Sequence, residues 1–373
     1  MLNLNLKRND KCWCGSNLKY KKCHLDRDKQ QRLTLGEIKG EKSKQKPLKK
    51  CFHRSVDGAN CDGKIINAHT VSKSSSLKKI ARDGKIYHYK PNFNALCKND
   101  GKFILELIGV SQASTFTGFC AYHDRTLFSP IENKEFTIDN YNCLLLGYRA
   151  ITKEIHAKLS QNDNVALLKE LDKGLPLIMQ FNLQQTIAVY EMGLKYGLDN
   201  LNEIKKEYDQ AFLQNDFSQV KYFVIEIADS ANIMFSGAFY PQYDFRGIKL
   251  QDYAESIKLD SIAVNVVATA TKSYIVFQWM GESDVNNKFI ESLLTYTKND
   301  WTNIITIFGF ATFENLFISP DWWDGLSVEI RGNLEKKVHE GVPFNNYLPS
   351  YLVPDGKCYN NWQNPTYSHN LNI

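Results

Sequence analysis

The placement of cysteine constrains this chain more than any other feature of its sequence. The 373 residues contain nine cysteines, and seven of them lie before residue 125, at positions 12, 14, 23, 51, 61, 97 and 120. No apolar run approaches the roughly 20 residues that span a bilayer, and the first residues lack the apolar core of a signal peptide. We therefore expect a cytoplasmic protein, in which disulfides are rare and clustered cysteines more often bind metal.

The first cysteine cluster offers four potential metal ligands within a short segment. These are Cys12, Cys14, Cys23 and His24. Zinc binds thiolate and imidazole groups in a tetrahedron, and a segment too short to bury a core gains its folding free energy from that binding. Gly15 and Ser16 follow the second cysteine and suit a turn around the ion. The segment therefore predicts a structural zinc site.

The same residues resemble the SEC-C motif, a short zinc-binding module at the C-terminus of the SecA translocation ATPase and in many bacterial proteins. The shared pattern is Cys-x-Cys-Gly-Ser, a stretch of Lys and Tyr, then Cys followed by Cys or His, and residues 12–24 contain each element. The resemblance implies an accessory module at residues 1–26 that contacts partner proteins or phospholipid. It implies no catalysis, because four protein ligands leave no open coordination position.

A second set of potential ligands is spread over residues 51–135. Cys51 and Cys61 form one pair, and Cys120 and His123 form a Cys-x-x-His pair further along the chain. Two such pairs, separated by a long insertion, fit a treble-clef arrangement with one pair on a turn and the other at a helix start. We expect a second structural zinc site here, with Cys97 as a rival ligand. Reduced core cysteines without metal are the alternative.

Residues 51–128 also resemble HNH-type ββα-metal domains, in which a histidine on a strand is the general base. His69 ends a β-like run, and Asp124 directly follows the Cys-x-x-His pair. The resemblance implies that His69 deprotonates water and that Asp124 binds a catalytic Mg²⁺ or Mn²⁺ ion. For His69, an ordinary hydrogen-bonded histidine or a zinc ligand in another pairing is the alternative.

The charge of the chain is distributed as unevenly as its cysteine. The whole sequence has 46 Lys and Arg against 41 Asp and Glu, a net of +5. Residues 1–50 contain 15 basic and 5 acidic residues, and residues 51–102 contain 10 and 4, so the remaining 271 residues carry a net of −11. A cationic end favours contact with DNA or RNA, which would be salt-sensitive and weakly sequence-specific because no motif for reading bases is present. An acidic protein partner, or simple pairing with the acidic remainder, is the alternative.

Periodicity predicts an α+β protein. Helical spacing prevails over residues 136–216, and a β-rich pattern follows. Residues 262–267 and 274–279 predict an antiparallel hairpin, and residues 303–310 predict a further strand. The expected divisions are a zinc knuckle (1–26), a basic linker or frayed helix (27–50), a treble-clef-like zinc domain (51–135), a helical segment (136–216), an α+β domain (217–340) and an irregular tail (341–373).

Three hypotheses about function follow. The first is a zinc-binding, nucleic-acid-associated protein of bacterial type, with an HNH-like metal-dependent nuclease as its specific form and nucleic-acid surveillance or phage defence as the setting suggested by analogy. The second is a non-enzymatic adaptor whose SEC-C module docks an acidic protein partner. The third places an unrecognised enzyme site in the α+β domain. No Walker loop, Gly-x-Ser-x-Gly or Gly-x-Gly-x-x-Gly pattern is present, so ATPase, α/β-hydrolase and Rossmann functions lack support.

Overall fold

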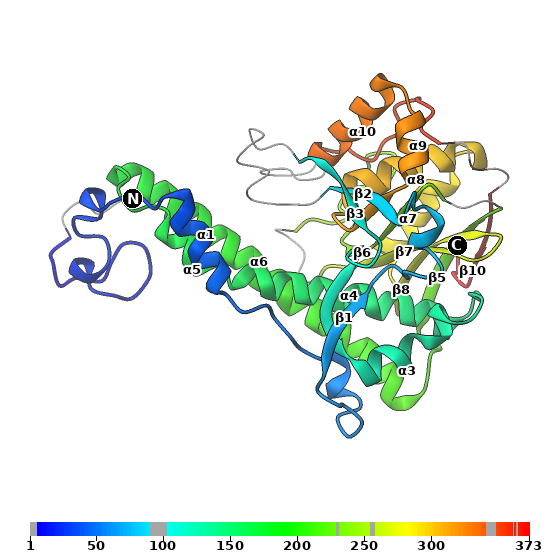
Figure 1. Cartoon of the computed structure of the whole chain (residues 1–373), viewed down its shortest axis with the longest axis horizontal. Coiled ribbons are helices and arrows are strands. Elements are labelled where there is room, and N and C mark those ends of the chain that lie inside the picture. The colour runs from blue at the N-terminus through cyan, green and yellow to red at the C-terminus, as the bar shows by residue number, and fades with distance from the viewer. Residues whose placement is uncertain are drawn as a thin grey trace. The chain divides into compact units, whose positions relative to one another are not determined.

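Figure 1 shows the fold in a computed structural model, which describes residues 6–89, 103–228, 231–253, 258–340, 348–360, 362 and 365–373. The rival ligand Cys97 lies outside the described residues. The chain forms two compact units: unit 1 comprises Met1–Leu48 with Ile155–Asn202, and unit 2 comprises Lys49–Glu154 with Glu203–Ile373. Two helices, α4 (Asn140–Asn162) and α6 (Leu177–Gln214), contribute residues to both units.

Unit 1 is helical around its cysteine-rich segment. Besides parts of α4 and α6, it contains the 3₁₀ turns η1 (Tyr20–Lys22) and η2 (Arg27–Lys29) and the helices α1 (Leu35–Lys44) and α5 (Val165–Glu170). Helix α1 begins with a capping box between Thr34 and Glu37 and has no buried residue. A small apolar core of Val165, Ile187 and Leu194 joins α5 to α6.

Within its described residues, unit 2 is built on an eight-stranded antiparallel sheet. The strand order is β10-β5-β8-β7-β6-β9-β2-β3, and β1 and β4 form a separate antiparallel pair. The strands are β1 (Ile65–His69), β2 (Lys85–Tyr89), β3 (Leu105–Gly109), β4 (Thr115–Cys120), β5 (Val220–Ile227), β6 (Ile233–Phe239), β7 (Ile262–Ala268), β8 (Ser273–Met280), β9 (Leu316–Ile318) and β10 (Thr366–His369).

Helices pack on both faces of this sheet at its centre, with α8 (Lys298–Thr312) on one face and α6 on the other. Unit 2 also contains α3 (Ala121–Glu132), which packs on β1 and β4, and the helices α7 (Asp284–Leu294), α9 (Pro320–Gly325) and α10 (Val328–Glu340), with the short turns η3 (Phe52–Ser55) and η4 (Leu77–Lys79). Successive side chains of a strand point to opposite faces. On β8, Phe277 stacks on Phe308 of α8 at 5.9 Å, whereas the neighbouring Gln278 accepts a 2.5 Å hydrogen bond from Tyr208 of α6. Every residue of β7 is buried, as expected for a strand covered on both faces.

The α+β class is confirmed, and so is the hairpin, since β7 pairs antiparallel with β8. The strand expected at residues 303–310 is wrong, because these residues lie inside α8. A fully buried apolar run has no polar face, so its sequence shows neither the helical period of 3.6 residues nor the strand period of two. Such a run is compatible with a buried helix and with a buried strand. Strand β10 adds regular pairing with β5 to a tail expected to be irregular. Strand β2, from the expected zinc domain, pairs with β9 in the large sheet.

Candidate metal centres

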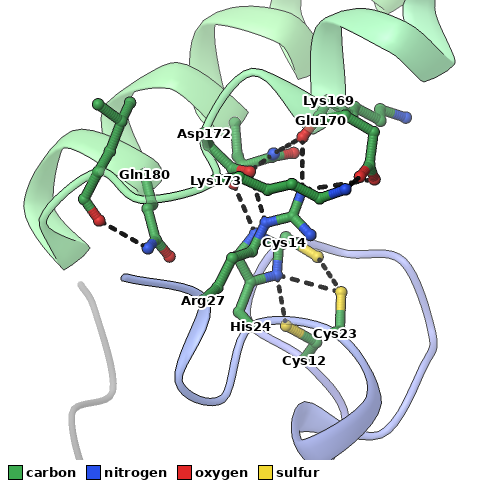
Figure 2. Close-up of polar contacts among 12 residues, drawn as sticks. Cys12, Cys14, Cys23, His24, Arg27, Lys169, Glu170, Asp172, Lys173 and Gln180 are labelled. Carbon is green, nitrogen blue, oxygen red and sulfur yellow. Dashed lines mark hydrogen bonds and ion pairs between the residues drawn. The ribbon is translucent and has the colours of Figure 1, made fainter. Parts of the chain in front are cut away.

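The first cysteine cluster closes around a common centre in unit 1. Nδ1 of His24 lies 3.2 Å from Sγ of Cys12 and 3.1 Å from Sγ of Cys23, and the sulfurs of Cys14 and Cys23 are 3.5 Å apart (Figure 2). The four ligand atoms all lie within 4.8 Å of one another. Gly15 adopts a positive φ of +77° in the turn that carries the chain back across the cluster, a conformation that glycine adopts without strain.

A buried carboxylate outside the motif holds the histidine of this cluster. Nε2 of His24 donates a 2.8 Å hydrogen bond to Asp172, which lies just after α5 and is fully buried (Figure 2). Asp172 also accepts from Arg27 at 2.5 Å and from Gln184 at 2.7 Å. Burial alone would raise the pKa of Asp172, but the hydrogen bonds from His24, Arg27 and Gln184 lower it below its usual value. The ionised carboxylate therefore fixes Nε2 as the protonated nitrogen and leaves Nδ1 free to bind a metal.

The donor set of the first cluster fits zinc. Three thiols and one imidazole at these separations match the tetrahedral Cys₃His sites that zinc prefers. Without a bound ion, burial raises the pKa of Cys14, but hydrogen bonds from the protonated His24 ring and from Ser16 outweigh it and lower that pKa to about 6, which favours the thiolate that a metal requires. A bound ion would take the place of the proton on Nδ1 of His24. Four protein ligands complete the coordination, so this centre can stabilise structure and has no position for a substrate.

The second cluster forms in unit 2 where η3 meets the end of β4 and the start of α3. Nδ1 of His123 lies 3.2 Å from Sγ of Cys51 and 3.3 Å from Sγ of Cys120, and Sγ of Cys61 is 3.9 Å from Sγ of Cys120. The ligand atoms again lie within 4.8 Å of one another, so the structure brings together the four residues expected for the second site. Nε2 of His123 lies 3.4 Å from the carboxylate of Asp57, which repeats more loosely the pairing of His24 with Asp172.

A buried polar network supports the second cluster. His53 packs edge-on against His123 with ring centroids 4.9 Å apart, and its Nδ1 lies 3.3 Å from the hydroxyl of Tyr148. That hydroxyl donates to Asp209 at 3.1 Å, and Lys205 donates to the same carboxylate at 2.6 Å. Burial lowers the pKa of His53 to about 4, so this imidazole is neutral and adds no positive charge beside the cluster.

The two residues expected to be catalytic lie close to the ion pair of Arg149, which is buried, with Glu132, which is partly exposed. Strands β1 and β4 and helix α3 form a ββα unit, with His69 at the end of β1 and Asp124 in the first turn of α3. Nε2 of His69 and Oδ1 of Asp124 are both buried without a hydrogen-bond partner among the described residues. Burial raises the pKa of Asp124 to about 6 and lowers that of His69, and the pair formed by Glu132 and Arg149 acts electrostatically on both. The catalytic assignment stays a prediction.

Three residues that matter at these centres carry no local sequence signal. Asp172 lies in the turn after α5 and Glu132 at the end of α3, and both are far in sequence from the residues they contact. Arg149 lies in a long apolar stretch of α4 and is only 1% exposed. A charged residue inside an otherwise apolar helical face is the one pattern that could have drawn attention to it, because arginine is almost never fully buried unless it is paired.

The α+β scaffold carries two Cys₃His groups, each with ligand atoms close enough together to hold a zinc ion. Residues 8–26 match the family model of the SEC-C motif, so the chain contains a SEC-C motif at this position. No curated protein and no solved structure shows significant similarity to the chain. Within the described residues, no helix is long and apolar enough to cross a membrane. The resemblance of residues 51–128 to HNH domains remains a prediction.

Proposed function

We propose that this protein is a two-zinc protein that binds the phosphate backbone of nucleic acid through its SEC-C module. The observation that carries the proposal is the surface of residues 6–26. Six basic side chains are exposed there, namely Lys7, Arg8, Lys11, Lys19, Lys21 and Lys22. Only two acidic side chains, Asp10 and Asp26, are exposed in the same segment. A bound zinc ion would hold these cations on one small rigid module.

The chemistry of this surface suits phosphate rather than bases. Lysine ammonium groups are compact, strongly hydrated charges that neutralise phosphates without reading sequence. Further exposed lysines continue along the adjoining segment, at Lys39, Lys42 and Lys44 on α1 and at Lys46. A run of this kind would track a polyanion over several phosphates, and binding would weaken steeply with salt as counterions are released.

The test is the salt dependence of binding by the zinc-loaded full chain. Fluorescence anisotropy with one duplex DNA and one single-stranded RNA, across a salt series, should give a log–log slope of about −0.7 to −0.9 per phosphate neutralised. The triple variant Lys19→Gln, Lys21→Gln, Lys22→Gln should weaken binding and reduce the slope by up to about two to three. A flat salt response in the wild type would contradict the proposal.

A matched control separates local contact from net charge. Lys288, Lys298 and Lys336 are exposed on α7, α8 and α10 in unit 2. Changing these three to Gln removes the same charge, and binding should stay close to that of the wild type. Equal losses from the two triple variants would show that total charge, and not the SEC-C surface, governs binding.

The same binding assay, with poly-glutamate added as a competitor, tests the adaptor hypothesis. An acidic protein partner presents carboxylates at irregular spacing, so poly-glutamate would compete well for a surface that serves such a partner. If poly-glutamate binds as tightly as RNA of equal charge, the adaptor is the better description and the nucleic-acid proposal fails.

A further inference from the structure

One face of helix α3 points a series of functional groups toward α4. Asp124, Phe128 and Glu132 follow one another at four-residue spacing and therefore share a face of the helix. Arg149 on α4 contacts two of them: its Nη1 donates to Oε1 of Glu132 at 2.8 Å, and its guanidinium lies 4.1 Å from the centroid of the Phe128 ring. His69 closes the group, since its carbonyl accepts a 2.6 Å hydrogen bond from the same Nη1.

Arg149 is held here as an internal cation. Its side chain is 1% exposed. The cost of burying its charge is offset by contacts with the Glu132 carboxylate, the His69 carbonyl and the face of the Phe128 ring. A guanidinium stays charged at any accessible pH, so this positive charge is permanent. It lies between the strand that carries His69 and the helix that carries Asp124.

A divalent cation does not fit beside this group. Mg²⁺ and Mn²⁺ require several oxygen ligands, and besides the Asp124 carboxylate the oxygens at this junction include Oε1 of Glu132 and the carbonyl of His69, which already accept from Arg149. Nε and Nη2 of Arg149 are also buried without a partner among the described residues. These two N–H donors require an acceptor, and a metal ion would add a second positive charge in front of them. Neither of the Cys/His/Asp/Glu groups suited to a metal in the described chain includes His69 or Asp124.

We infer that Arg149 is the resident cation of the His69–Asp124 site, so that this ββα unit takes no divalent metal ion. The Mg²⁺ or Mn²⁺ implied by the HNH resemblance is replaced by a side chain of the protein itself. Arg149 joins β1, α3 and α4 into one buried polar junction beside the second cysteine cluster. The inference is independent of the proposed nucleic-acid binding, because it concerns different residues in the other unit.

The test measures Mn²⁺ binding by electron paramagnetic resonance, on zinc-loaded full-length protein. The wild type should bind no more Mn²⁺ than Asp124→Asn does. Arg149→Met removes the guanidinium but keeps an apolar body of similar length, and it should gain a Mn²⁺ site. That site should disappear again in Arg149→Met combined with Asp124→Asn. Arg149→Lys keeps a positive charge and should gain none.

Two results would overturn the inference. One is a Mn²⁺ site in the wild type that Asp124→Asn removes. The other is an Arg149→Met protein that retains its zinc and its circular dichroism yet gains no Mn²⁺. If Arg149→Met fails to fold, comparing Mn²⁺ binding by the wild type and by Asp124→Asn still tests the inference, because that comparison needs no change at Arg149.

Discussion

Asp172 accepts a 2.8 Å hydrogen bond from Nε2 of His24 across 148 residues of sequence. The SEC-C motif is therefore fastened to the helices of unit 1 through one of its own metal ligands. A ligating histidine whose other nitrogen donates to a carboxylate keeps its tautomer and orientation, and it becomes a stronger ligand. Zinc bound at this cluster would consequently be coupled to the packing of α5 and α6 within this unit.

Substituting Asp172 should weaken the first zinc site. We expect Asp172→Asn to lower zinc affinity by roughly 10- to 100-fold, the usual effect of losing such a carboxylate. Competition with a chromogenic chelator measures this. Glu170→Gln is the matched control, because Glu170 is 43% exposed and contacts Arg27 at 3.4 Å without contacting the histidine. An Asp172→Asn protein that holds zinc as tightly as Glu170→Gln would refute the positioning role.

The equivalent change at the second cluster should matter less. Asp57 lies 3.4 Å from Nε2 of His123 and its side chain is 32% exposed, whereas Asp172 is fully buried. A longer and partly solvated contact contributes less to holding the ring. Asp57→Asn should therefore reduce zinc affinity by a smaller factor than Asp172→Asn in the same chelator assay. The reverse order would contradict the geometric ranking.

Acid should destabilise the wild type more than a variant without His69. Burial is the main cause that lowers the pKa of His69 below 6.5, with Lys73 and Arg149 lowering it further and Glu132 opposing them. The unfolded chain therefore binds this proton more readily than the folded protein does. The stability contributed by neutral His69 is complete above about pH 6.5 and declines as the pH falls through that value toward the folded pKa.

Thermal melting of wild type and His69→Gln checks this dependence. Between about pH 7.5 and pH 5.5 the melting temperature of His69→Gln should fall less than that of the wild type. Protonation of the cysteine and histidine ligands affects both proteins alike and cancels in the comparison. Parallel curves would mean that the burial of His69 does not govern its protonation.

The His69–Asp124 site should not support metal-dependent cleavage. With Mg²⁺ or Mn²⁺ added, we expect the wild type to leave duplex DNA and single-stranded RNA intact, at the same level as His69→Ala. The physical reason is the guanidinium of Arg149, which already donates hydrogen bonds to the His69 carbonyl and to the Glu132 carboxylate, two oxygen groups that a divalent ion would need as ligands. Cleavage by the wild type that His69→Ala abolishes would restore the nuclease hypothesis.

Sequence reasoning succeeded where the decisive contacts are local. The ligands from Cys12 to His24 lie within one short segment, so their spacing alone indicates the cluster, and the hairpin of β7 and β8 is visible because its loop is short. It failed where distant segments decide. The pairing of β2 with β9 and the contact of Asp172 with His24 depend on tertiary packing that no local pattern encodes. Helix α8 is predicted wrongly as a strand because it is buried on nearly all sides. It therefore has no polar face from which the 3.6-residue helical period could be recognised.

The central claim is that two separate Cys₃His centres each hold a structural zinc ion, and metal analysis of the purified full chain tests it most directly. Mass spectrometry of metal content should find two zinc ions per chain, matching the two ligand groups. Cys14→Ser and Cys61→Ser should each lose one ion, while Cys358→Ser, at an exposed cysteine outside both groups, should keep two. A wild type with a single ion, or a Cys61→Ser protein that still holds two, would contradict the account.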